Sequence, residues 1–247
     1  MGIWEAPKEA FLQALDCEHD IQSPRKHGYA TVEAIEAMHK GDAKVFFAMG
    51  GNFIAATPDT YYTAQALQNC DLTVQVSTKL NRSHLVHGKS ALILPCLGRT
   101  DIDIQSSGEQ FVSCENSMGV VQSSKGILKP PSNQLKSEVA IVCELANTVL
   151  PESNIDWLAF QSNYNDIRLA IEHVIPGFDE YNERIRQPGG FYLPNGARER
   201  RFHTDDGKAH FTVISLPDHT LNSDEYVMMT LRSHDQFNTT IYGMDDR

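Results

Sequence analysis

The sequence predicts an α/β protein with a doubly wound, mostly parallel sheet flanked by helices. Three observations lead to this prediction. Strand and helix patterns alternate over the first hundred residues, which is typical of parallel strands with right-handed crossovers. An apolar strand pattern at Val45–Met49 runs directly into the glycine pair Gly50 and Gly51. A helix start follows, because Thr57, Pro58 and Asp59 supply a capping residue, an N-terminal proline and an acid in turn.

The expected elements can be placed in chain order. Helical patterns cover 7–15 and 31–40, and the second has apolar residues on one face and Gly41 as its stop. The remaining expected elements are strands at 45–49, 72–76, 91–94, 110–113 and 119–123, helices at 58–68, 134–150 and 155–175, and strands at 209–215 and 226–231.

These elements suggest a domain organisation. We expect residues 1–185 to form a Rossmann-like α/β cofactor-binding segment. The stretch 187–207 is rich in Gly, Pro and Arg, so 186–225 is expected to be an irregular connecting region with a β-hairpin. The chain stops soon after a polar run at 232–243, without a closing helix or strand, and we therefore expect it to be part of a longer polypeptide.

Composition narrows the class of protein. The chain has 247 residues and a formal net charge of −11, which argues against a general nucleic-acid binder. Its five cysteines are scattered and form no CxxC pair, which is typical of reduced thiols in a cytoplasmic protein and argues against a zinc site or an iron–sulfur cluster in this segment. No apolar run approaches the ~18 residues of a membrane span, so we expect no membrane partner.

The glycine turn is the first candidate site. Glycine allows a sharp turn and close approach of a ligand to backbone N–H groups, and such turns at the ends of parallel strands hold phosphates. Gly50, Gly51 and Asn52 are therefore candidates for binding a phosphate-bearing ligand. The GxGxxG pattern is absent and no acid ends the second strand, which disfavours a standard NAD site. A tight connection without any ligand stays open as the alternative.

Two polar loops are the other candidates. Ser77, Thr78 and Lys79 follow the second strand, next to the glycine turn in such a sheet, and suit phosphate or ribose recognition. A solvated loop is the alternative there. A second polar loop follows the last expected strand, and its candidate ligand-binding residues are Arg232, His234, Gln236, Asn238 and Thr239.

The sequence gives little support to hydrolase chemistry, a metal site or a pair of catalytic acids. No GxSxG elbow exists, which argues against hydrolase chemistry. His84 and His87 have no third ligand nearby, so we assign no metal site. Asp101 and Asp103 are expected to be solvated loop residues. No catalytic residue is assigned.

Taken together, several segments resemble the molybdopterin oxidoreductases of the bis-molybdopterin-guanine-dinucleotide class, specifically the formate dehydrogenase-like α subunits. They occur in the family's order and cover nearly all of residues 40–247. The matching segments are VFFAMGGNFIAATPDT, LTVQVSTKLNRSHLV, ALILPCLGRTDID, GEQFVSCENSMGVV, HTDDGKAHF and MMTLRSHDQFNTTIYG.

The resemblance implies a cofactor and a role. Residues 50–52 would line the phosphates of a molybdopterin guanine dinucleotide, 77–79 its ribose and guanosine end, and the loop at 232–239 the pterin or pyrophosphate. Residues 226–247 would begin a truncated C-terminal β-barrel domain. The reaction would be a two-electron transfer at molybdenum or tungsten, with a small-molecule substrate and an electron-transfer partner engaged by the full-length enzyme.

Two departures from the family qualify this expectation. The metal ligand and any 4Fe-4S cysteines would lie upstream, so the segment alone is expected to be inactive. The family's Asn-x-Glu-Gly-Arg stretch is replaced by CENSM at 114–118. The alternative function is a non-catalytic α/β nucleotide-binding or interaction module. A phosphate-dependent transferase is a more distant third, since no P-loop is present.

Overall fold

The structure is a computed structural model that describes residues 9–216 and 220–229. The chain divides into two compact units, Met1–Leu193 and Pro194–Arg247. Within the described residues, all helices and strands belong to the first unit. The domain limits at 185 and 225 stay predictions.

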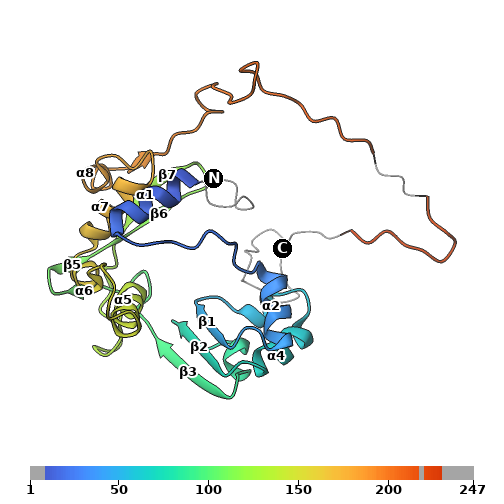
Figure 1. Cartoon of the computed structure of the whole chain (residues 1–247), viewed down its shortest axis with the longest axis horizontal. Helices are drawn as coiled ribbons and strands as arrows, with labels where there is room; N and C mark the ends of the chain where they lie inside the picture. Colours follow the sequence, from blue (N-terminus) through green and yellow to red (C-terminus); the bar gives the residue numbers. More distant parts are fainter. Residues whose placement is uncertain (1–8, 217–219, 230–247) are drawn as a thin grey trace. The chain divides into compact units, whose positions relative to one another are not determined.

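A three-stranded parallel sheet organises the N-terminal half of the first unit (Figure 1). Its strands are β1 (Val45–Met49), β2 (Leu72–Ser77) and β3 (Ser90–Pro95), in the spatial order β1-β2-β3. The register places Met49 opposite Val76 and Val76 opposite Leu94. The predicted α/β class with a parallel sheet and flanking helices is thereby confirmed. All three strands end on the same side of the sheet, and we call the residues that follow them the carboxyl edge.

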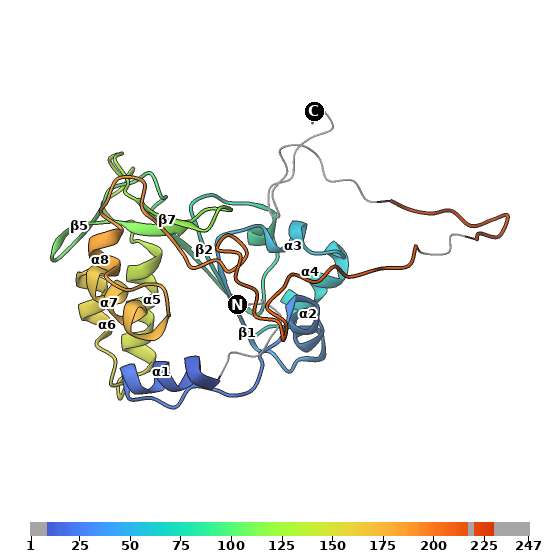
Figure 2. The same ribbon diagram turned by 90° about the horizontal axis from the view of Figure 1, so that it is seen from above.

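Helices cover one face of this sheet. α2 (Thr31–Lys40), α3 (Phe53–Ala56) and α4 (Thr60–Gln68) lie together on it, as both ribbon views show (Figures 1 and 2). The core between these helices and the sheet contains the buried residues Ile35, Met38, Ile54, Ala66, Leu67 and Cys70. The apolar spacing of α2 predicted this packing, and its bounds match the prediction.

The opposite face is covered only in part. α5 (Glu138–Val149) reaches it at Ile141, which packs with Val76 and Cys96. Away from this contact, Val45 and Phe47 remain exposed and, with Leu92, help line a hollow of 790 Å³. Parallel sheets normally bury both faces, so this face carries an unusual amount of open apolar surface.

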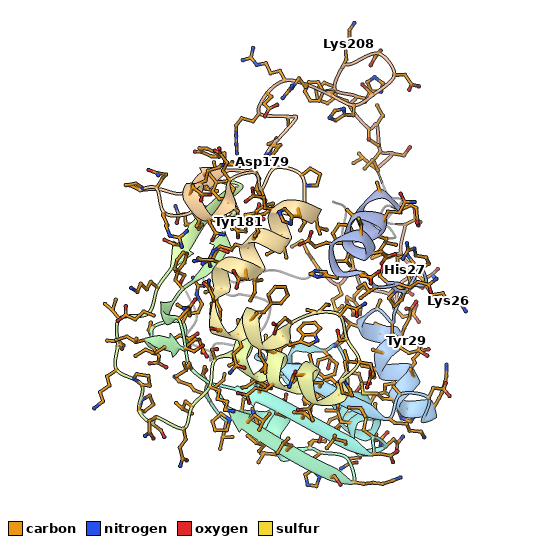
Figure 3. The ribbon with its side chains drawn as sticks, turned by 60° about the vertical axis from the view of Figure 1, so that its left-hand side comes forward. Lys26, His27, Tyr29, Asp179, Tyr181 and Lys208 are labelled. Carbon is orange, nitrogen blue, oxygen red and sulfur yellow. The ribbon has the colours of Figure 1, made fainter. Side chains whose placement is uncertain are left out.

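The remaining elements of the first unit include two smaller antiparallel sheets. Tyr181, labelled in Figure 3, packs with Val121, Ile185 and Phe191 in a second core. The elements are η1 (Arg82–Leu85), α1 (Glu9–His19), α6 (Trp157–Ser162), α7 (Tyr164–Val174), α8 (Tyr181–Arg184), β4 (Asp103–Gln105), β5 (Gly108–Gln110), β6 (Val112–Glu115), β7 (Val120–Ser124) and β8 (Phe191–Tyr192).

Four expected helices differ from the prediction. The helix expected at 7–15 continues to His19. The other three differ for local reasons. The helix expected at 134–150 begins only after Ser137, because the Lys136 carbonyl accepts the Leu97 N–H and holds the preceding residues beside β3. The helix expected at 155–175 is two helices, since Asn163 adopts an extended conformation between them. The helix expected at 58–68 is α4, which is capped by Asp59 and not by the buried Thr57, and the short helix α3 precedes it.

Three expected strands also need correction. The strand expected at 110–113 is divided, because β5 ends at Gln110 and β6, in another sheet, begins at Val112. Residues 209–215 form no ladder within the described chain, and their apolar side chains are exposed, with Phe211 at 98% and Val213 at 95%. An isolated strand has no partner for its backbone groups, so the alternating pattern alone does not produce a sheet. The described part of the strand expected at 226–231 forms no ladder either, and the rest lies outside the described residues. The start of a barrel domain there stays a prediction.

Candidate functional site

The glycine turn lies at the carboxyl edge, directly after β1. Gly50 and Gly51 have φ of +69° and +74°, the left-handed region in which side chains are disfavoured. The Gly50 N–H donates to the Val76 carbonyl at 2.7 Å, so it continues the pairing between β1 and β2. The N–H groups of Gly51 and Asn52 make no hydrogen bond with any residue that the structure describes. These two N–H groups, and not that of Gly50, are the turn's available donors.

A hydrogen bond from a buried serine holds the side chain of Asn52. The Ser83 hydroxyl donates to Asn52 Oδ1 at 3.0 Å and accepts the Ile54 N–H at 3.0 Å. Ser83 is fully buried, at 0% exposure. The Asn52 Nδ2 group has no partner within the described chain. Asn52 therefore adds two further donors beside the turn.

Asn81 joins the loop after β2 to the glycine turn. Its Nδ2 donates to the Gly51 carbonyl at 2.7 Å, and its Oδ1 accepts the Ser83 N–H at 2.9 Å. The buried Gln75 amide supports the same loop through the Ser83 carbonyl. The Gly51 carbonyl is therefore already occupied.

The predicted site residues Ser77, Thr78 and Lys79, at the end of β2 and directly after it, lie at the same edge. The Ser77 hydroxyl donates to the Lys79 carbonyl at 2.7 Å, which folds the loop back on itself. Thr78 is exposed, and its Cγ2 would lie 3.9 Å from a Cβ added at Gly98. The loops that follow β2 and β3 are thus neighbours at the carboxyl edge.

The charge of the two loops that follow β1 and β2 at this edge is opposite to that of the whole chain. Lys79 and Arg82 are exposed, and their side chains have no hydrogen bond or ion pair among residues 9–216 and 220–229. Neither 50–54 nor 77–85 contains an acid. Backbone and amide donors next to two free cations suit an anionic group such as a phosphate.

The structure thus brings together six of the predicted site residues, 50–52 and 77–79, at one edge of the sheet. The other five predicted residues, Arg232, His234, Gln236, Asn238 and Thr239, lie outside the described residues. Ser83 and Asn81 lie in the matching segment LTVQVSTKLNRSHLV, but the sequence analysis did not assign them to the site. Their hydrogen bonds to Asn52 and Gly51 span 31 and 30 positions, and no local sequence pattern predicts a hydrogen bond between such distant residues.

Asp103 does not behave as the solvated loop residue that we expected. Its carboxylate accepts hydrogen bonds from the Tyr164 hydroxyl at 2.5 Å and from Gln105 at 2.6 Å. Tyr164 is buried and also bonds Ser137 at the start of α5. Burial and the bond to Asp103 raise the pKa of Tyr164. Because every member has a partner, the network holds β4 against α5 and α7, and we assign it no chemistry.

Two features are absent from the part of the chain that the structure describes. Among the described residues, no group of three or more His, Cys, Asp or Glu side chains is arranged to hold a metal ion. Nor does any described helix have the length and apolar character needed to cross a membrane.

The fold and the edge define a class: an α/β protein with a donor-lined glycine turn suited to a phosphate. No family model matches the chain. It is 55% identical over 249 residues to a Mycobacterium tuberculosis (strain ATCC 25618 / H37Rv) protein named an uncharacterized oxidoreductase. It is 46% identical over 251 residues to the protein YdeP of Escherichia coli (strain K12). Both similarities cover 100% of this chain but only 32% and 33% of the relatives, so the chain spans about a third of their length.

Proposed function

We propose that this chain is the cofactor-binding segment of a molybdenum or tungsten oxidoreductase of the bis-molybdopterin-guanine-dinucleotide class. The observation that carries the proposal is the glycine turn at the carboxyl edge, with its free N–H groups at Gly51 and Asn52. The name of the mycobacterial relative supports oxidoreductase chemistry. The order of matching segments supports the molybdopterin class and, within it, a formate dehydrogenase-like enzyme.

The residues present fit a dinucleotide's charged portion. The N–H groups of Gly51 and Asn52 and the Asn52 amide would hold phosphate oxygens, while the Gly50 N–H stays in the sheet. Thr78 and Lys79 would lie toward the ribose and guanosine end. When bound, the cofactor would supply two-electron transfer at its metal centre. The part of this chain is to bind the phosphates, orient them and offset their charge.

The proposal extends to the residues beyond the described part and to the whole polypeptide. The loop with Arg232, His234, Gln236, Asn238 and Thr239 would contact the pterin or pyrophosphate. A small-molecule substrate and an electron-transfer partner would be engaged elsewhere in the longer protein, in the cytoplasm. Any 4Fe-4S cluster would belong to a preceding part of that polypeptide.

Metal and pterin analysis of the longer polypeptide tests this function. After anaerobic purification we expect molybdenum or tungsten by mass spectrometry, and a fluorescent pterin after oxidation in stoichiometric amount. A protein that retains neither would overturn the molybdopterin assignment. Guanine-nucleotide binding without metal or pterin would favour the non-catalytic binding module instead.

A further inference from the structure

We propose that Ser83 fixes the Asn52 side-chain amide so that its N–H groups, and not its oxygen, face the ligand. The inference rests on the proposed phosphate site and deepens it in two ways. It identifies Ser83 as a positioning residue. It also states which chemical groups the edge accepts and which it rejects.

The argument begins with the hydrogen-bonding capacity of a hydroxyl. Ser83 has one proton to donate and two lone pairs that accept. One lone pair accepts the Ile54 N–H at 3.0 Å. Because Ser83 is fully buried, no solvent is available for its proton, and Asn52 Oδ1 at 3.0 Å is the acceptor within reach.

A flipped amide would be unfavourable. It would place the Asn52 N–H groups against Ser83 Oγ and leave the hydroxyl proton buried without an acceptor. An unsatisfied buried donor carries a desolvation cost that the observed orientation avoids. The surroundings offer little room for adjustment, because Asn81 and Gln75 hold the Ser83 backbone through its N–H and its carbonyl.

The orientation determines the selectivity of the edge. With Oδ1 occupied by Ser83 and the Gly51 carbonyl occupied by Asn81, neither of these two acceptors is left for a ligand. What remains are the Asn52 amide protons and the N–H groups of Gly51 and Asn52. A ligand atom that accepts hydrogen bonds, such as a phosphate oxygen, is satisfied there. A ligand group that only donates is not.

Hydrogen exchange of the Asn52 side chain tests the orientation without any ligand. In the 15N-labelled chain, the Asn52 amide signals are assigned by their loss in Asn52→Asp. We expect these protons to exchange rapidly with water, since they point away from buried Ser83. Strongly protected protons in the free chain would mean that they donate into the interior, and the inference would be wrong.

Titration with inorganic pyrophosphate tests the consequence for binding. We expect Asn52→Asp to weaken binding about a hundred-fold and Ser83→Ala about ten-fold, as for hydrogen bonds to a charged group. Thr63→Ala is the matched control, because Thr63 is equally buried but its hydroxyl bonds Thr57. It should cost similar stability and leave the affinity unchanged.

The outcomes separate the two proposals. If Ser83→Ala and Thr63→Ala weaken binding equally, Ser83 acts through general stability and the positioning role is refuted. If the wild-type chain binds no pyrophosphate, the proposed phosphate site fails. The exchange rate of the Asn52 amide still decides the orientation in that case, and also if Ser83→Ala does not fold.

Discussion

At the scale of single residues, the carboxyl edge carries local positive charge although the chain as a whole is acidic. A net charge of −11 repels anions, and only local groups can reverse that effect. Lys79, Arg82 and the free N–H groups provide this reversal over a few residues. The sequence shows the residues with these groups as polar loop residues, but it does not show the fixed direction of the Asn52 amide.

Gly50 allows a direct test of backbone conformation. Its φ is +69° and an added Cβ would meet nothing within 4 Å, so alanine there suffers conformational strain without a clash. We expect Gly50→Ala to lower the free energy of unfolding by about 1 kcal/mol in urea denaturation. Gly28→Ala is the control, since Gly28 is equally open and its φ lies outside the left-handed range. Equal effects of the two substitutions would contradict the turn conformation.

Tyr164 predicts a pH dependence. Its pKa is raised by burial and by the bond to Asp103, so the folded state keeps the phenol proton where the unfolded chain loses it. The associated stability is fully present below about pH 10, the ordinary tyrosine value, and is lost as pH rises above it.

Urea unfolding between about pH 8 and about pH 11 measures this effect, because this range includes the ordinary pKa of tyrosine. We expect Tyr164→Phe to be less stable at the lower pH, because Asp103 and Ser137 each lose a hydrogen bond, and to show a shallower decline at higher pH. Tyr29→Phe, at an exposed position, should retain the wild-type decline. An unchanged decline in Tyr164→Phe would refute the prediction.

At the scale of secondary structure, the prediction is correct for elements that have both a clear sequence pattern and a neighbouring element to pack against. α2 and β1 match their expected bounds because each has both the right periodicity and a neighbour to pack against. The stretch 209–215 has the periodicity of a strand but no pairing partner in the described chain. Asn163 divides a predicted helix because its side chain accepts the Asn165 N–H and starts a new one. Such capping choices depend on competing side chains and are difficult to read from spacing alone.

The cap of α4 can be tested by substitution. Asp59 Oδ1 accepts the Tyr62 N–H at 2.9 Å. We expect Asp59→Ala to lower the free energy of unfolding by about 1 kcal/mol and Asp59→Asn to change it little, since asparagine also caps helices. Equal losses in both variants, measured by chemical denaturation, would show that the side-chain cap is not what stabilises this helix end.

At the scale of the whole chain, the uncovered sheet face is the clearest departure from an ordinary α/β protein. Phe47 is 37% and Val45 59% exposed there. We expect the folded chain to bind the dye ANS, which reports exposed apolar surface, and Phe47→Asn to reduce that binding. Tyr61→Asn, which changes an exposed aromatic on α4, is the control and should leave the dye signal unchanged. Dye binding that is absent, or insensitive to Phe47→Asn, would contradict an open face.

The central claim is that the glycine turn at the carboxyl edge binds a phosphate-bearing ligand. Calorimetric titration of the 247-residue chain with guanosine diphosphate tests it most directly. We expect saturable binding that weakens at high salt and is lost in Asn52→Asp, because the added carboxylate repels the phosphates. Absence of binding at low salt, or binding unaffected by Asn52→Asp, would contradict the claim.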